Sequence, residues 1–231
     1  MNVLLMAGVV FAMAALGGLA LVALVGRRLV RAAVYATAAA AVGAVYGAAL
    51  VATSLLSKER LLAAGETKRF CGFYLDCHLG VSVERVELVP EIGGVRASGA
   101  FHVLTLRISS NAVRATLRPG RLHLLLLDAE GREMERAPAA ESALALARGD
   151  DDQPLERDVV AGGSYTVTVV FDVSAAATAP PPRLWAREGI GLDRVIERVL
   201  IGDEDALLHR PVLLALPRPE PAEGAAGQER V

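Results

Sequence analysis

Two long runs of apolar residues fill the N-terminal quarter of the chain. The first 56 residues carry only three charged side chains, Arg27, Arg28 and Arg31, and apolar runs flank them at residues 3–25 and 32–56. At a rise of about 1.5 Å per residue, a helix over either run exceeds the roughly 30 Å hydrocarbon core of a bilayer. Because backbone groups in lipid must bond to one another, we expect both runs to be helical. The pattern predicts a transmembrane helical hairpin over residues 1–57 with a tight turn at 26–30.

Two other interpretations of these runs stay open. Buried core helices are also apolar, although such runs rarely exceed about 20 residues. A cleaved signal peptide has a basic start and an apolar stretch of about 7–15 residues. Met1 and Asn2 carry no basic side chain, and the first run is longer than that. An uncleaved hairpin fits these features best.

Small residues repeat along the second run. Gly43 and Gly47 form a small-xxx-small pair, which Ala36 and Ala40 extend. In lipid there is little hydrophobic drive between helices, so close backbone contact over small residues holds them together. The spacing predicts packing of the two spans against each other, with dimerisation through the glycines as the alternative.

The arginines also indicate which side of the membrane each part occupies. Basic residues close to spans stay in the cytoplasm, so Arg27, Arg28 and Arg31 place the turn there and both chain ends outside. Four basic residues after the second span weigh against this orientation: Lys58, Arg60, Lys68 and Arg69.

The only two cysteines, Cys71 and Cys77, lie within residues 58–78, which we expect to form a polar stalk. Two cysteines close in sequence are typical of a local disulfide in an oxidising compartment, which would stabilise the fold by about 2–3 kcal/mol. Free thiols are one alternative, and a metal site with His78 is another. Zinc requires four ligands, or three with water, and the remaining histidines are scattered. The disulfide interpretation favours an external location for the domain.

From residue 79 onward the apolar residues alternate with a period of two, which is typical of strands. We expect strands at 79–89, 101–109, 121–127, 132–136, 164–173, 183–186 and 194–201, and an edge strand at 211–216. Residues 128–131, Asp-Ala-Glu-Gly, predict a turn in which the glycine can take a positive φ. Residues 141–148 fit either a strand or a helical turn. Many short strands with frequent turn signals predict an all-β sandwich of immunoglobulin-like topology over residues 79–217. Residues 218–231 are rich in Pro, Glu, Gly and Ala and predict a disordered tail.

Alternation within two of these strands indicates which side chains face the same way. One face of 164–173 carries Tyr165, Val167, Val169, Phe171 and Val173. One face of 101–109 carries Leu104, Leu106 and Ile108.

Little in the chain points to chemistry. The part after the spans holds all 26 acidic residues and all but three of the 24 basic ones, an acidic balance that does not suit nucleic-acid binding. Nucleophile-elbow, zinc-protease and phosphate-loop motifs are absent. The acidic runs 150–152 and 203–205 lack the ligand spacing of a calcium loop. We expect structural roles for the four histidines: His78, His102, His123 and His209. The sequence therefore predicts no catalytic, cofactor-binding or metal-binding residue and no cofactor, and the protein is not expected to be an enzyme.

Four short motifs follow one another between residues 101 and 216: Leu106-Arg-Ile-Ser-Ser-Asn111, Leu126-Leu-Asp-Ala-Glu-Gly131, Val160-Ala-Gly-Gly163 and Thr168-Val-Val-Phe-Asp-Val173. Together they resemble a bacterial family of telokin-like, immunoglobulin-like extracytoplasmic domains of unknown function. The resemblance implies the fold and a place at the cell surface, but no catalytic residue. The chain departs from the family in having two N-terminal spans, no lipobox cysteine, and Gly162-Gly163 where many relatives have Pro-Gly.

Two functional hypotheses follow from these features. In the first, the chain is a multi-pass protein of the bacterial cytoplasmic membrane. Its partners are the lipid bilayer and a protein of the envelope, and its sandwich lies in the periplasm or outside the cell for protein binding or a structural role. In the second, the hairpin is the working part, as an accessory or regulatory subunit of a membrane transport or secretion complex. The spans contain no Asp, Glu, Lys or His, which argues against an ion path of their own.

Overall fold

The chain forms two compact units in the structure, a computed structural model that describes residues 2–70, 78–119, 122–149, 155, 157–175, 181–187 and 192–219. One unit consists of Met1–Glu59 with Gly191–Pro211, and the other of Arg60–Ile190 with Val212–Val231. The backbone therefore passes from one unit to the other three times. Cys71, Cys77, the acidic run 150–152 and residues 220–231 lie outside the described residues, so the disulfide and most of the disordered tail stay predictions.

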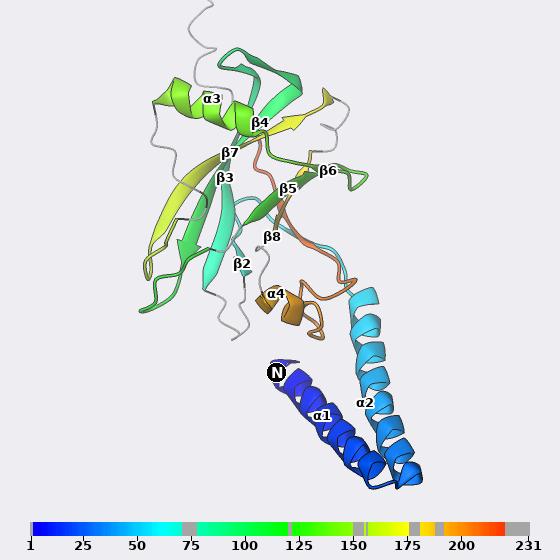
Figure 1. Ribbon diagram of the computed structural model, residues 1–231. Coiled ribbons are helices and arrows are strands. Elements are labelled where there is room, and N and C mark those ends of the chain that lie inside the picture. The colour runs from blue at the N-terminus through cyan, green and yellow to red at the C-terminus, as the bar shows by residue number, and fades with distance from the viewer. Residues whose placement is uncertain are drawn as a thin grey trace, which may run out of the picture. The chain divides into compact units, whose positions relative to one another are not determined.

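The first unit contains two long helices, α1 (Asn2–Val25) and α2 (Leu29–Leu55), over the predicted apolar runs (Figure 1). The backbone reverses at Gly26–Arg28 through hydrogen bonds from Arg28 N to Ala23 O (2.8 Å) and from Arg27 N to Leu24 O (3.0 Å). This is the pattern of a Schellman cap, whose left-handed position is usually glycine. Arg27 occupies that position here, with φ of 55°. The tight reversal makes α1 and α2 antiparallel neighbours.

Residues 192–211 belong to the same unit and begin with a short helix, α4 (Leu192–Glu197). The strand predicted at 194–201 is therefore wrong. Its apolar residues recur at 195, 196, 199 and 200, which is helical spacing. Two turn bonds, from Val199 N to Ile196 O and from Leu200 N to Glu197 O, continue the chain after α4.

The second unit is a β-sandwich of two sheets (Figure 1). One sheet has the order β1-β9-β8-β5-β6 and the other the order β2-β3-β4-β7. All strand pairs are antiparallel except β1 with β9. The strands are β1 (Arg60–Leu62), β2 (Lys68–Phe70), β3 (Leu79–Ile92), β4 (Val95–Ser110), β5 (His123–Leu127), β6 (Glu133–Met134), β7 (Ser164–Val173), β8 (Arg183–Arg187) and β9 (Val212–Ala215).

The main core of the sandwich confirms the predicted alternation. One buried cluster contains Leu104, Leu106 and Ile108 of β4 together with Val167, Val169, Phe171 and Val173 of β7, and Tyr165 packs against it. These side chains meet Leu124 and Leu126 of β5 and Leu184 of β8, which come from the other sheet. The period-two pattern thus identified the core face of the strands predicted at 101–109 and 164–173.

Two predictions about the ends of the sandwich need correction. Residues 58–78 are not simply a stalk, because β1 and β2 lie within them: Arg60 pairs with Val212 and Phe70 with Leu79. The strand predicted as an edge at 211–216 lies between β1 and β8. Strands of three or four residues show no readable periodicity, and the partner of β9 lies at the far end of the domain sequence.

The ambiguous stretch 141–148 is part of a helix, α3 (Pro138–Arg148), which begins with Pro at its first turn and ends at Gly149 with φ of 63°. The helix packs on the outer face of β3, β4 and β7 (Figure 1). Its contact forms a second, smaller core with Ile92, Phe101, Val103, Ala140 and Val170. A Cβ at Gly93, in the two-residue β3–β4 turn, would lie 2.9 Å from Ala143 Cβ. Glycine at this turn therefore permits both the positive φ and the close approach of α3.

Glu141 connects α3 to the edge of β7. Its Oε1 accepts hydrogen bonds from Val170 N (2.9 Å) and Arg136 Nε (2.8 Å), and its Oε2 from an Arg136 Nη at 2.6 Å. Ala137 N donates to Val170 O at 2.7 Å. Both backbone groups of Val170 are thus paired, which blocks this part of an otherwise open strand edge.

Replacing Glu141 should loosen α3 and destabilise the sandwich. The Glu141 side chain is 12% exposed, and Glu141→Ala would leave Val170 N and the Arg136 guanidinium without this acceptor. We expect a loss of about 1–3 kcal/mol in the free energy of unfolding. Chemical denaturation of the full chain in detergent, followed by the emission of Trp185, the only tryptophan, measures it. The exposed Glu133→Ala is the matched control and should change stability by less than about 0.5 kcal/mol. Equal effects of the two variants would contradict the proposed anchoring.

Candidate functional site

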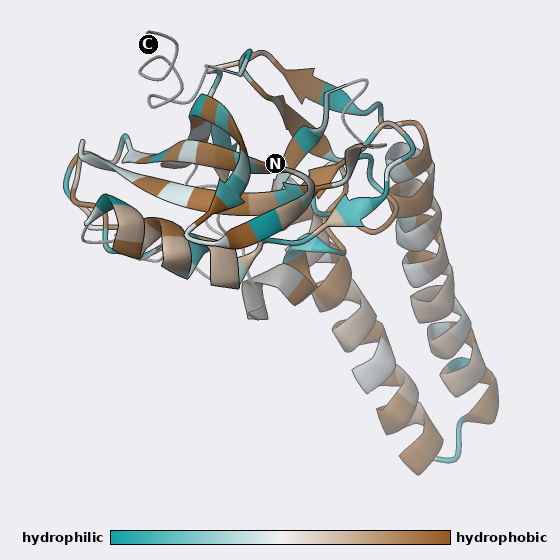
Figure 2. Cartoon of the chain, turned by 90° about the horizontal axis from the view of Figure 1, so that it is seen from above, coloured by the Kyte–Doolittle hydropathy of each residue, from teal (hydrophilic) through white to brown (hydrophobic). Residues whose placement is uncertain are grey.

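The two helices of the first unit present a long apolar surface. Both are long and apolar enough to cross a membrane. Leu4, Phe11, Val22, Val30 and Val45 are between 71% and 79% exposed. Figure 2 shows apolar colour along both helices and polar colour at the reversal between them. Because these side chains are exposed among the described residues, the helices are not the buried core pair considered as one alternative.

The three arginines predicted to set the membrane topology lie together at the reversal. Arg27 and Arg28 form the turn and Arg31 lies in the first turn of α2, and all three are exposed. They are the only charged side chains of the hairpin sequence, so its two ends differ strongly in charge.

Of the two glycines predicted to pack the helices, Gly43 lies at the contact with α1. A Cβ on Gly43 would lie 3.1 Å from Met13 Cε, whereas a Cβ on Gly47 would meet no described atom within 4 Å. Ala36 and Ala40 are exposed. The small-residue stripe therefore turns partly away from α1, and much of it stays uncovered in this unit.

The sandwich contains a buried lysine that the sequence analysis did not single out. Lys68 of β2 is 4% exposed, and its Nζ donates to Ala186 O of β8 at 2.8 Å and to Val212 O of β9 at 3.5 Å. The ammonium group also lies 5.2 Å from the centre of the Phe70 ring. Because β2 belongs to one sheet and β8 and β9 to the other, Lys68 links the two sheets.

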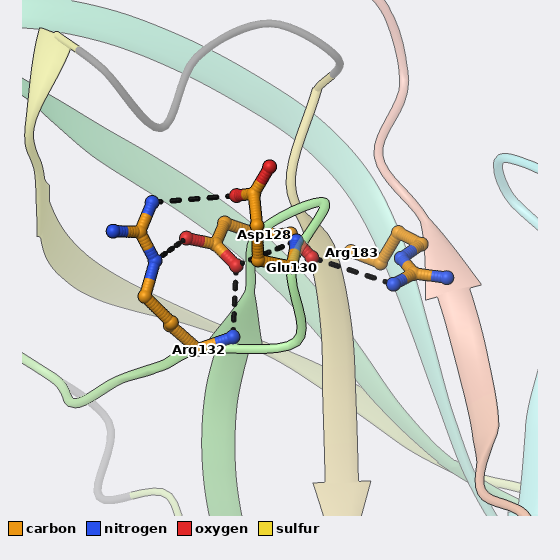
Figure 3. Close-up of polar contacts among 4 residues, drawn as sticks. All are labelled: Asp128, Glu130, Arg132 and Arg183. Atoms are coloured by element: carbon orange, nitrogen blue, oxygen red, sulfur yellow. Dashed lines mark hydrogen bonds and ion pairs between the residues drawn. The ribbon is translucent and has the colours of Figure 1, made fainter.

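The clearest polar network surrounds Asp128, in the turn between β5 and β6 (Figure 3). Its Oδ1 accepts from Glu130 N (3.0 Å) and Arg132 N (2.8 Å), and its Oδ2 accepts from Arg132 Nε at 2.5 Å. An Arg183 Nη donates to Asp128 O at 3.4 Å. Gly131 has φ of 79°, as a three-residue hairpin loop requires. This network fixes the Asp-x-x-Gly turn predicted from the sequence.

Burial opposes the charge of Asp128, whose side chain is 2% exposed, and by itself would raise the pKa of the carboxyl group. The hydrogen bonds from Arg132 and Glu130, with the Arg132 charge, outweigh burial and hold the pKa below its ordinary value. Arg132 is 65% exposed, so its charge is screened by solvent, and the two backbone N–H bonds are the protected part of the network. In Figure 3 Glu130, Arg132 and Arg183 each bond to Asp128, and Arg132 also bonds to Glu130, which is the arrangement of a structural turn.

Among the other described titratable groups, the buried Glu87 pairs with Arg85 (2.8 Å) and Arg148 (2.9 Å), which is an ion-pair cluster and not a set of metal ligands. The described residues contain no cluster of three or more His, Cys, Asp and Glu side chains able to hold a metal ion. His123 is exposed, while His102 is 4% exposed, with its Nδ1 lacking a hydrogen-bond partner among described atoms. Burial lowers the pKa of His102, and the nearby Ala100 backbone opposes this shift to a smaller extent. In the run 203–205, Asp203 Oδ1 accepts from Asp205 N at 2.9 Å, so this carboxylate shapes its own turn.

Neither a protein-family model nor a curated protein matches the chain. Among solved structures, the secreted protein MPT63 of Mycobacterium tuberculosis is similar at 16% identity and a TM-score of 0.40, over 59% of this chain and 93% of that one. The yjhA protein of Bacillus subtilis is similar at 13% identity and a TM-score of 0.39, over 67% and 98%. An uncharacterised β-sandwich protein of Clostridium difficile gives 7% identity and a TM-score of 0.36, over 68% and 94%. The resemblance to the telokin-like family stays a prediction.

Replacing the ammonium group of Lys68 while keeping its aliphatic chain tests how much the hydrogen bonds of Nζ contribute to stability. Lys68→Met keeps the length of the side chain but leaves the carbonyls of Ala186 and Val212 without this donor. We expect the free energy of unfolding to fall by about 1–3 kcal/mol, measured by denaturation as above. Lys58→Met, at an exposed position just after α2, is the control and should have little effect. An unchanged stability of Lys68→Met would show that packing alone accounts for the site.

Acid should weaken the sandwich through Asp128. A carboxyl group whose pKa is lower in the folded than in the unfolded state stabilises the fold above its unfolded pKa. That stabilisation is lost as the pH falls from 3.8, the ordinary pKa of an aspartate carboxyl group, through the lower pKa of Asp128 in the folded state. Asp128→Asn should therefore lower the thermal midpoint at neutral pH and flatten its decline in acid.

Asp158→Asn is the matched control for this measurement. The pKa of Asp158 is also lowered, chiefly by the side-chain hydrogen bond from Arg118. The Asp158 side chain is 48% exposed, however, and that of Arg118 is 80% exposed. An exposed pair contributes little to stability, so this variant should keep most of the wild-type acid dependence. The assignment to Asp128 fails if both variants follow the same profile.

Proposed function

We propose that the chain is a membrane-anchored envelope protein. In this proposal it presents an immunoglobulin-like β-sandwich outside the cytoplasmic membrane for protein binding or a structural role. The observation that carries the proposal is the exposed apolar surface of α1 and α2. These helices have 24 and 27 residues, or about 36 and 40 Å, enough to cross a hydrocarbon core of roughly 30 Å.

Charge supports the orientation in this proposal. Arg27, Arg28 and Arg31 lie at the reversal of the hairpin, which the positive-inside tendency places in the cytoplasm. The chain leaves the other end of α2 only four residues before β1 begins, so the sandwich follows on the outer side. An external compartment is oxidising, which suits a disulfide between Cys71 and Cys77. Phe70 and Leu79 pair on either side of the segment that carries both cysteines, and a disulfide would close a short loop there.

A binding or structural role fits the polar groups of the sandwich better than catalysis does. The well-defined polar interactions described above serve the fold: Asp128 shapes a turn, Lys68 links the sheets and Glu141 holds α3. Catalysis requires several such groups to converge on one place where a substrate can bind. We therefore propose a non-enzymatic protein whose partners are the bilayer and another envelope protein.

The second candidate, an accessory or regulatory subunit of a membrane transport or secretion complex, is favoured by one observation. Ala36 and Ala40 are exposed and Gly47 has open space on its Cβ side. Small residues on a lipid-facing helix surface allow another transmembrane helix to approach closely. Co-purification of a larger membrane assembly that is lost in Gly47→Leu, but kept in Gly8→Leu on α1, would favour this candidate.

Thiol labelling of intact cells tests the proposed anchoring and orientation. We expect a membrane-impermeant maleimide to label Cys71 and Cys77 only after treatment with an impermeant reductant, because an external disulfide protects both thiols. The double variant Cys71→Ser/Cys77→Ser is the control for background labelling. Labelling that requires cell lysis but no reductant would place the thiols in the cytoplasm, and the proposed orientation would be wrong.

A further inference from the structure

Residues 192–211 lie along the C-terminal half of α2. Tyr46 Oη donates to Val199 O at 2.6 Å, and Arg210 N donates to Ser57 Oγ at 2.8 Å. Tyr46 and Ser57 are roughly 16 Å apart along the helix direction. Between them, one helical turn apart on the same face, Leu50 and Ser54 are 7% and 0% exposed. We call residues 192–211 the docked segment.

The docked segment has two kinds of apolar side chain. Leu200 and Ala206 are buried, at 3% and 6% exposure. Val195, Val199, Leu207 and Leu208 are between 43% and 63% exposed, although they belong to the same short stretch. Four exposed aliphatic side chains on a segment already packed against an apolar helix extend the apolar surface of that helix sideways.

The position of the Tyr46 bond shows how deep this surface lies. Tyr46 is nine residues before the end of α2, or about 13 Å along its axis. A hydrocarbon core of roughly 30 Å centred on the 40 Å helix would leave about 5 Å of helix at each end, so Tyr46 would lie inside the core. Water is scarce there, and an unpaired hydroxyl or carbonyl is costly. The bond from Tyr46 to Val199 satisfies both groups at once.

We propose that the docked segment is a lipid-binding element that inserts into the outer leaflet beside α2, with Val195, Val199, Leu207 and Leu208 in contact with acyl chains. The inference rests on the proposed membrane anchoring. The lipid it fits is zwitterionic, because residues 195–210 carry four acidic and only two basic side chains and offer no attraction for anionic headgroups. Insertion to a depth of about 5–10 Å is ordinary for interfacial segments.

Quenching by brominated lipid tests the proposal in the full chain. In a Trp185→Phe background, single tryptophans are introduced by Leu207→Trp or Val195→Trp in the docked segment. Phe11→Trp, at a residue of α1 that is 76% exposed, reports on the hairpin, and Leu146→Trp, at an 85% exposed residue of α3, reports on the sandwich. The protein is reconstituted in phosphatidylcholine vesicles with and without bromine on the acyl chains. We expect loss of most emission at 207, 195 and 11, and none at 146.

Each other outcome of the quenching experiment has one meaning. Quenching at 11 without quenching at 207 and 195 would overturn the lipid-binding element and leave the anchoring intact. A blue-shifted but unquenched emission at 207 would show that protein covers the segment, which also overturns the proposal. No quenching at any position would contradict the anchoring itself. Quenching at all four positions, the sandwich control included, would show that the signal is not specific to the docked segment and would overturn the proposal.

A second measurement keeps Trp185 and tests the Tyr46 bond. Arg198 is exposed, and trypsin can cleave after it once the docked segment leaves the membrane. In the same vesicles, Tyr46→Phe should accelerate cleavage at Arg198 several-fold relative to wild type. Tyr35→Phe, also in α2, is the matched control and should not. Equal cleavage of wild type and Tyr46→Phe would overturn the role of this bond.

Discussion

The parallel pairing of β1 with β9 is the constraint on which the rest of the chain path depends. Two neighbouring strands that run in parallel begin at the same end of the sheet. β1 follows α2 directly and β9 follows residues 192–211 directly, so both approaches reach the sandwich at one place. Within the helical unit, the same two stretches are already joined by the bond from Arg210 N to Ser57 Oγ. The excursion of the chain between β8 and β9 therefore has to return to the end of the second helix.

Hydrogen-bond satisfaction explains why that excursion is folded and not a plain loop. Within a membrane span, a polar group without a partner from the protein is costly, and Ser54 Oγ, close to the end of α2, is a buried group that lacks one among the described atoms. Thr53 Oγ1 bonds to Ala49 O and Leu50 O of its own helix, which is a usual solution for hydroxyl groups. The Tyr46 hydroxyl extends away from its own backbone and uses Val199 O instead. The carbonyl it bonds belongs to a turn after α4, so the folding of residues 192–211 and the chemistry of the helix surface are coupled.

The sequence predicted the features that depend on long local patterns. The two helices, the core face of β7 and the Asp128 turn each rest on several residues close in the chain. Features that depend on distant partners could not be found in this way. β1 has three residues and pairs with Val212 to Leu214, and no window of sequence contains both strands. Lys68 looked like a stalk residue because its carbonyl acceptors come from β8 and β9. The sequence Ile92-Gly-Gly-Val95 is typical of a two-residue hairpin turn. It was missed because the predicted strands ended at residue 89 and resumed only at residue 101.

The exposed edges of the sandwich limit how a partner can bind. In the described part of the chain the outermost strands β1, β2 and β6 have three, three and two residues, too short to template a long added strand. The fourth edge, β7, has ten residues, but Glu141 and Ala137 occupy both backbone groups of Val170. On β7, strand addition is therefore restricted to the first half, before Val170. The fourteen-residue β3 pairs with β2 only at Leu79–Val81 in the described part of the chain, so its later residues offer a second stretch of edge. A partner that does not add a strand can use the loops at the ends of the sheets, where surface segments are free to vary without disturbing the core.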